Sequence, residues 1–333
     1  MKKILSILCI LVSFSACSNK EITADKLQNR NDSYYEVNQT KPFTGVARKY
    51  YKSGQISEEK LYKNGKLEGL FKSYHDNGLL QCEGNYINNK KDGSWKSYYK
   101  NGKIKTEENY KLDIKEGTWK SYYENSFTVS EEKTYVNNKL DGLWKWYHKN
   151  GKLGSEGLYK AGKANGLQKE YYSNGQLKIE RSFKLGKEDG YRREYHENGN
   201  VSSEGNYESD KPTGIWKSYY ENGNLNSIGN LKAGIVEGNY KMYYENGALN
   251  FEGFYKDDEP HGLCKHYSEI GTLISEATYS NGNLEGPAKY YSSNGELIKE
   301  GDYKSNRKNG VWKEYSITGQ VSSEKTYVNG REI

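Results

Sequence analysis

The chain has 333 residues, of which 34% are hydrophobic, 33 are Tyr and 36 are Gly. Ordinary globular domains contain roughly 45–50% apolar residues, so a conventional aliphatic core and a polytopic membrane protein are both disfavoured. The 14% aromatic content is too high for a disordered coil. The 50 basic and 44 acidic residues are mixed evenly along the chain, which excludes the unmatched basic face typical of nucleic-acid binding.

The N-terminus has the pattern of an export signal. Lys2 and Lys3 precede an apolar run over residues 4–14, followed by Ser15, Ala16 and Cys17. About eleven apolar residues are too few to span a bilayer as a helix. Small residues before a cysteine resemble a bacterial lipobox, which implies a signal peptide over 1–16, lipidation of Cys17 and a tether over 17–33. Simple secretion and an uncleaved anchor are the alternatives.

The resemblance to a lipobox also bears on location. Ser18 follows the cysteine, and by that resemblance retention in the inner membrane is not signalled. The sequence therefore predicts an exported lipoprotein of the outer membrane or cell surface.

A repeat of 24 residues occupies the rest of the chain. Its spacing is set by glycines that recur every 24 residues, with one interval of 25 between Gly117 and Gly142. A half repeat over 34–44 precedes twelve full repeats over 45–333, and the array as a whole covers 34–333. The glycines are Gly45, Gly69, Gly93, Gly117, Gly142, Gly166, Gly190, Gly214, Gly238, Gly262, Gly286 and Gly310.

Two turn signals punctuate each repeat. The first is an Asn-Gly pair, such as Asn222-Gly223, and the second always places Gly, Asn or Asp at one position, such as Gly234. Asn-Gly between runs rich in aromatic residues is a strong signal for a two-residue hairpin turn with both residues at positive φ. Two turns per repeat predict two short strands per repeat, and therefore an all-β fold, an elongated antiparallel β-meander built from twelve hairpin repeats.

Counting outward from the Asn-Gly turn predicts the register. In the eighth repeat Glu221 meets Asn224 and Lys217 meets Ile228. In every other repeat a basic residue faces a Glu, and opposite charges directly across strands are stabilising. These rows could also be read as general acids, but a catalytic pair occurs once in a chain, so we interpret the row as a device that sets register.

The strands have two chemically different faces. One carries Trp and Tyr, with Trp216 opposite Gly229, and forms either the core alone or a core that also contacts a ligand. The other carries the charges and a Tyr in every repeat, and this Tyr row is the predicted recognition surface. We take Tyr195, Tyr219 and Tyr243 as its representatives and expect their loss to cost little stability.

Two repeats depart from the pattern, through drift or to provide a partner contact. The fourth replaces Asn-Gly with a longer loop carrying Phe127, and the fifth adds Trp146 beside Trp144. Both Phe127 and Trp146 are therefore candidate binding residues.

The sequence offers few residues suited to catalysis or metal binding. The sequence contains no recognisable Ser/His/Asp arrangement, no phosphate-binding glycine loop and no paired CxxC motif. His261, Cys264 and His266 cluster in the tenth repeat, but three potential ligands without a fourth are weak support for a metal. We expect no catalytic residue, no cofactor and no metal, and no disulfide between Cys82 and Cys264, which lie eight repeats apart.

The repeat G-x-W-K-x-Y-Y-x-N-G-x-L, as in residues 214–225, resembles the bacterial variant of the MORN repeat, grouped with YwqK-like antitoxins. The resemblance covers 34–333 and implies a hairpin array; elsewhere such repeats are linked to lipid binding, scaffolding and dimerisation. We therefore expect a binding module for a protein, glycan or lipid partner. An antitoxin or immunity protein is the alternative, and an enzyme is the third class.

Overall fold

The computed structural model describes residues 20–333, so the predicted leader and Cys17 lie outside the described residues. The chain divides into two compact parts, which meet between Lys139 and Leu140 and are described separately below. In both parts almost all regular structure is β-strand, as the sequence predicts. Within the described range no helix is long and apolar enough to cross a membrane.

The N-terminal part begins with a small cap and continues into the repeats. The cap strand β1 runs parallel to β4, whereas the later pairings of this part are antiparallel. The elements are β1 (Glu21–Thr23), the 3-10 helix η1 (Ala24–Lys26), β2 (Leu27–Arg30), β3 (Ser33–Glu36), β4 (Gly45–Tyr50), β5 (Ile56–Lys63), β6 (Lys66–Tyr74), β7 (Leu80–Ile87), β8 (Lys90–Tyr98), β9 (Ile104–Lys111), β10 (Ile114–Lys115), β11 (Gly117–Tyr122) and β12 (Val129–Val136).

The cap differs from the expected tether. Residues 20–33 contribute β1, η1 and β2, and β2 pairs with β3 as a separate hairpin. Phe43, Ala47 and Tyr62 form a buried cluster, against which Ile22 and Leu27 pack. Because a terminal repeat lacks a neighbour on one side, such a cap shields apolar surface that an inner repeat would cover.

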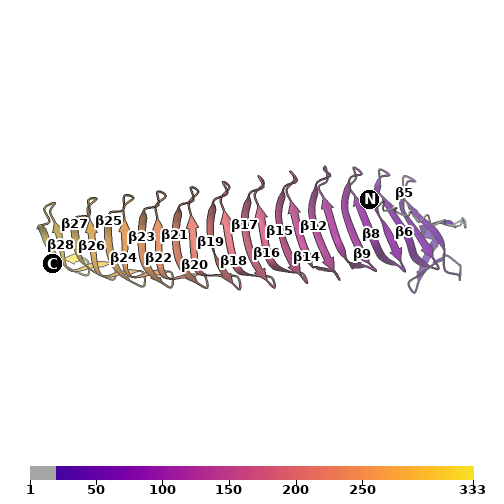
Figure 1. Cartoon of the computed structure of the whole chain (residues 1–333). Coiled ribbons are helices and arrows are strands. Elements are labelled where there is room, and N and C mark those ends of the chain that lie inside the picture. The colour runs from indigo at the N-terminus through magenta and orange to yellow at the C-terminus, as the bar shows by residue number, and fades with distance from the viewer. Residues whose placement is uncertain (1–19) are drawn as a thin grey trace, which may run out of the picture. The chain divides into compact units, whose positions relative to one another are not determined.

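The C-terminal part repeats one hairpin after another, and successive strands lie side by side in chain order (Figure 1). The two-residue strand β13 (Lys139–Leu140) falls at the division between the parts. The strands of this part are β14 (Gly142–Tyr147), β15 (Leu153–Lys160), β16 (Lys163–Tyr171), β17 (Leu177–Lys184), β18 (Lys187–Tyr195), β19 (Val201–Glu208), β20 (Lys211–Tyr219), β21 (Leu225–Lys232), β22 (Ile235–Tyr243), β23 (Leu249–Lys256), β24 (Glu259–Tyr267), β25 (Leu273–Ser280), β26 (Asn283–Tyr291), β27 (Leu297–Lys304), β28 (Arg307–Tyr315), β29 (Val321–Val328) and β30 (Arg331–Glu332).

The Asn-Gly turn differs in type from the prediction. Gly223 has a φ of 89°, but Asn222 keeps a negative φ, and the Gly223 amide donates to the Tyr220 carbonyl at 2.9 Å. The expected Glu221 to Asn224 pair is therefore not formed; the Tyr220 amide instead donates to the Asn224 carbonyl at 2.9 Å. The Asn222 side chain bridges repeats, because its Nδ2 donates to the Glu245 carbonyl at 3.0 Å.

The second turn is the one with two left-handed residues. Ala233 has a φ of 54° and Gly234 a φ of 93°, between the paired residues Lys232 and Ile235. These are the features of a two-residue primed hairpin turn. The predicted preference for Gly, Asn or Asp at this position is confirmed, although the preceding position also adopts a left-handed backbone.

The predicted register of the longer strands is confirmed. Lys217 pairs with Ile228 and Trp216 with Gly229, and a bulge between Ser218 and Tyr219 shifts the pairing next to the turn by one residue. A second bulge lies between Glu204 and Asn206 on the preceding strand. Beyond the first bulge the pairing returns to the register that a two-residue loop would give. A count from such a loop is therefore correct away from the turn, although the turn itself differs.

Side chains of neighbouring repeats, and not an aliphatic interior, form the core. Among the described residues, the buried hydrophobic side chains include Trp95 and Trp312, each 2% exposed. The Trp95 indole N–H donates to the Asn85 carbonyl at 3.1 Å, and the ring lies 5.0 Å from that of Tyr86. The predicted aromatic face is therefore the packed face.

The Trp ring covers a different glycine from the one expected. Trp216 pairs with Gly229, but a Cβ added to Gly205 on the preceding repeat would lie 2.3 Å from the Trp216 ring. Gly229 instead accommodates the Tyr240 ring of the next repeat. Trp216 and Tyr240 thus lean over the backbone of the repeat before them, and Trp216 is only half-buried.

Candidate functional site

The charged face of the C-terminal part is a row of alternating charges. In this row the basic residues pair with a Glu on the neighbouring strands, except where position 228 intervenes. From the seventh repeat onward, in order across the sheet, the residues are Arg193, Glu204, Lys217, Ile228, Lys241, Glu252, Lys265, Glu276, Lys289, Glu300, Lys313 and Glu324. Only position 228 interrupts the alternation in this stretch.

Several neighbours in this row form ion pairs. Lys241 Nζ lies 3.1 Å from a Glu252 carboxylate oxygen, and Arg193 lies 2.7 Å from Glu204. The Lys241 side chain is 44% exposed, so the pair is solvated and contributes little stability, at about 0–1 kcal/mol. The row therefore fixes the register and presents charges to solvent.

The Tyr row of the charged face joins one repeat to the next. In most repeats the Tyr hydroxyl donates to the Glu that lies 15 residues earlier, on the preceding repeat. The donors and acceptors are Tyr98 to Glu83, Tyr122 to Glu107, Tyr171 to Glu156, Tyr195 to Glu180, Tyr219 to Glu204, Tyr267 to Glu252, Tyr291 to Glu276 and Tyr315 to Glu300, at 2.5 to 2.9 Å.

These contacts refine the expectation for the three representative tyrosines. Tyr195, Tyr219 and Tyr243 are all half-buried and lie on the charged face of the same part. Burial, followed by the bond to Glu204, raises the pKa of Tyr219 to about 12. For Tyr243 the acceptor position, 15 residues earlier, holds Ile228, whose side chain offers no oxygen. The Tyr row therefore bonds neighbouring repeats and is also partly exposed to solvent. The constant spacing between the Tyr and the Glu in the sequence could have indicated these bonds.

Glu204 collects more partners than the other acids in the row. It accepts bonds from Tyr191, Tyr219 and Arg193, and Lys217 Nζ lies at 4.0 Å. The bond from Tyr191 is the largest of the contributions that lower the pKa of Glu204 to about 2. Its carboxylate is therefore already committed within the protein.

The two irregular candidates lie in different parts of the chain. Phe127, in the N-terminal part, is 79% exposed, and Lys103 Nζ lies 5.2 Å from the centre of its ring. Trp146, in the C-terminal part, is 37% exposed, and its ring lies 4.8 Å from that of His148. Both side chains are accessible, but no single described site contains them together.

Three histidines take the place of an aromatic residue of the repeat. Tyr220 donates its hydroxyl to the Tyr243 carbonyl at 2.7 Å. In the equivalent slots His75, His148 and His196 place Nε2 at 2.9, 3.1 and 3.0 Å from the corresponding carbonyls. These side chains bridge repeats and are not arranged around a common centre.

The tenth-repeat cluster is part of the packed face. Cys264 is 1% exposed, and its sulfur lies over Gly253, while the His266 ring lies 4.8 Å from that of Phe251. Burial lowers the pKa of His266. Over residues 20–333 no group of three or more His, Cys, Asp or Glu could hold a metal ion, and Cys82 and Cys264 are free thiols.

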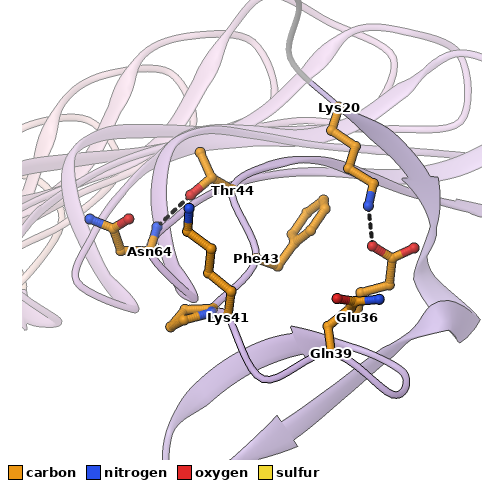
Figure 2. A pocket seen from close by; sticks show the side chains of 8 residues that line it. Lys20, Glu36, Gln39, Lys41, Phe43, Thr44 and Asn64 are labelled. Carbon is orange, nitrogen blue, oxygen red and sulfur yellow. Dashed lines mark hydrogen bonds and ion pairs between the residues drawn. The ribbon is translucent and has the colours of Figure 1, made fainter.

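A pocket lies beside the cap, where Lys20 and Glu36 face each other as an ion pair (Figure 2). Phe43 lies between this pair and Thr44, whose hydroxyl accepts the Asn64 amide at 2.9 Å. The remaining lining residues are Gln39, Lys41 and Pro42, and Phe43 belongs to the buried cluster of the cap. These lining side chains form no recognisable catalytic set.

This geometry is that of a hairpin repeat array, and a family model agrees. The model described as "MORN repeat variant" matches eleven segments of the chain, which together cover more than half of it, so the chain belongs to this family. The model passes over residues 113–139, where the longer loop with Phe127 replaces Asn-Gly. The matched residues are 43–64, 67–88, 91–112, 140–161, 164–185, 188–209, 212–233, 236–257, 260–281, 284–305 and 308–329.

Solved structures give only distant likenesses. The chain is 12% identical to one in the "Crystal Structure of TcdB2-TccC3-TEV", with 92% of this chain and 20% of that chain covered and a TM-score of 0.16. It is 11% identical to one in the "Structure of Photorhabdus luminescens Tc holotoxin pore", with coverages of 90% and 20% and a TM-score of 0.15. The chain thus spans about a fifth of the length of those chains. A search of curated proteins gave no match.

Proposed function

We propose that this chain is an exported, lipid-anchored scaffold that binds a protein, glycan or lipid partner without catalysis. The observation that carries the proposal is the charged face, where half-exposed Tyr, Lys and Glu side chains recur at a fixed interval. The contacts between repeats hold these groups in place before a partner arrives. Because a preordered surface loses less conformational entropy on binding, such a face suits recognition spread over several repeats.

Binding at a repeated surface depends on the number of repeats engaged. Each exposed ion pair or hydrogen bond is weak by itself, at about 0–1 kcal/mol. Several equivalent slots engaged by one extended partner add their contributions, because every contact after the first is intramolecular. This argument places the specificity in the spacing of the groups and not in an enclosed pocket.

The anchor is tested separately from the binding. Cys17→Ala should abolish incorporation of labelled palmitate and release the chain from membranes, while Ser18→Ala should leave both unchanged. Palmitate incorporation that persists in Cys17→Ala would contradict lipid attachment. With the anchor in place, we propose the outer membrane or cell surface as the location.

The binding is tested by cross-linking capture from the native host, with the full-length chain as bait. A variant that carries Lys217→Gln, Lys241→Gln and Lys265→Gln should lose the captured partner. A matched variant that carries Lys232→Gln, Lys256→Gln and Lys304→Gln removes the same charge from exposed strand ends and should keep it. Equal capture by the two variants would contradict a role for the charged face.

The alternative is an antitoxin or immunity protein, which the resemblance to YwqK-like proteins favours. That function predicts a toxin gene beside this one and growth arrest when this gene alone is deleted. Normal growth of the deletion strain, together with partner capture through the charged face, would support the scaffold.

A further inference from the structure

The eighth repeat lacks one carboxylate in the charged face. Ile228 pairs with Lys217 on one side and Lys241 on the other, in the slot that Glu204 and Glu252 fill in the neighbouring repeats. From Arg193 to Lys265 the row therefore holds four basic side chains and two acidic ones. A regular row of that length would hold three acids, so this position is short of one negative charge.

The hydrogen-bond acceptor is missing together with the charge. Tyr219 donates to Glu204 at 2.7 Å, and Tyr267 donates to Glu252 at 2.9 Å. Tyr243 occupies the same slot between them, and its acceptor 15 residues earlier would be position 228. Lys217 and Lys241 thus flank a position whose side chain supplies no oxygen, and that position is the one from which Tyr243 would receive its acceptor.

The neighbouring acids compensate for this loss only in part. Lys217 Nζ lies 4.0 Å from Glu204, whose carboxylate already binds Arg193 at 2.7 Å and two Tyr hydroxyls. Lys241 Nζ lies 3.1 Å from a Glu252 oxygen, but the Lys217 and Lys241 side chains remain 40% and 44% exposed. An anion can therefore approach both lysines from solvent, over the half-buried Ile228 side chain.

We propose that the surface formed by Lys217, Ile228, Lys241 and Tyr243 is a binding site for an Asp or Glu side chain of an acidic segment in a protein partner. The partner's carboxylate would take the place that a Glu of this chain holds in the other repeats and would receive the same donors. The slot is open and unenclosed, which suits one side chain of a longer polypeptide better than a small free acid. This inference rests on the proposed binding function.

The test uses the full chain and a fluorescent hexaglutamate peptide, with binding followed by anisotropy at low salt. Ile228→Glu fills the slot from within and should weaken peptide binding by about tenfold, since two lysine contacts are lost to the new carboxylate. Ile228→Val keeps the slot open and should bind like the parent. Unchanged binding by Ile228→Glu would overturn the inference.

A variant that gains a site provides a control, because misfolding could not increase peptide binding. Glu300 lies between Lys289 and Lys313 and accepts the Tyr315 hydroxyl, so Glu300→Ile should create a second slot of the same kind and raise the peptide stoichiometry. Unchanged stoichiometry in a folded Glu300→Ile chain would contradict the proposal. Inorganic phosphate, or vesicles with anionic lipid, that bind with the same dependence on position 228 would also overturn the assignment to an acidic polypeptide.

The capture experiment distinguishes the two proposals. A partner that is captured through the charged face equally well by the parent and by Ile228→Glu leaves the scaffold function standing and removes this site. Failure of capture through the charged face counts against the scaffold function itself.

Discussion

The two faces of the sheet stabilise the same strands through different interactions. On the packed face, Trp95 is 2% exposed because its ring lies over Gly84, where an added Cβ would come within 2.2 Å of it. On the charged face, Tyr219 reaches Glu204 through a hydrogen bond and stays half-buried. Stability on the first face depends on close packing, whereas on the second it depends on a bond between repeats. The effects of substitutions should differ accordingly.

The largest expected effect comes from removing a fully packed Trp. Trp95→Ala should destabilise its neighbouring strands by about 3–5 kcal/mol, as large-to-small changes in a core do. Trp119 occupies the same slot one repeat later. The position equivalent to Gly84 holds Glu108 there, and Trp119 is half-buried. Trp119→Ala should therefore cost clearly less. Hydrogen exchange of the amides in β7 to β12 would measure both, and equal protection losses would contradict the role of the glycine.

A smaller effect is expected from a methyl group added under a ring. A Cβ at Gly301 would lie 2.3 Å from the Trp312 ring, so Gly301→Ala should cost about 1–3 kcal/mol through overpacking. Ala277 lies opposite Ala288, where no ring needs the space, and Ala277→Gly is the matched control with a cost of about 1 kcal/mol or less. Thermal unfolding followed by tryptophan fluorescence would compare the two variants.

Alkaline pH should weaken the hydrogen bonds of the charged face. Burial and the bond to Glu raise the pKa of Tyr98, Tyr122, Tyr171, Tyr219, Tyr267 and Tyr291 to about 12. The folded state therefore favours the protonated hydroxyl. The contribution of these hydroxyls to the free energy of unfolding is complete below the unfolded pKa of about 10. It is lost as the pH rises through about 12. Replacement of these six tyrosines by Phe should flatten the pH dependence of the unfolding midpoint between these values; a dependence as steep as in the parent would contradict this assignment.

Much of this architecture follows from the sequence, because the repeat constrains it so strongly. Regular glycines and turn signals predict the strands, and counting from Asn222-Gly223 gives the correct pairing of Lys217 with Ile228. The turn type was wrong, because Asn222 uses its side chain to bridge repeats instead of adopting a left-handed backbone. A contact between repeats of that kind is not encoded in the local sequence.

Side-chain direction was the other property that the sequence could not supply. Pairing places Trp216 beside Gly229, yet the ring leans over Gly205, because the side-chain torsion and not the register decides which neighbour it covers. The bond from Tyr219 to Glu204 could have been anticipated, since a Glu stands 15 residues before the Tyr in most repeats. The same count identifies Tyr243 as an exception, with Ile228 in place of the acid.

That exception gives the most direct test of the central claim, which is that on the charged face a Tyr hydroxyl and a Glu bond most repeats to the next. Tyr219→Phe removes one hydroxyl that has an acceptor, and Tyr243→Phe removes one whose acceptor slot holds Ile228. Measured by local hydrogen exchange in the full chain, Tyr219→Phe should lower stability by about 1 kcal/mol, and Tyr243→Phe should leave it unchanged. Equal losses in the two variants would contradict the account.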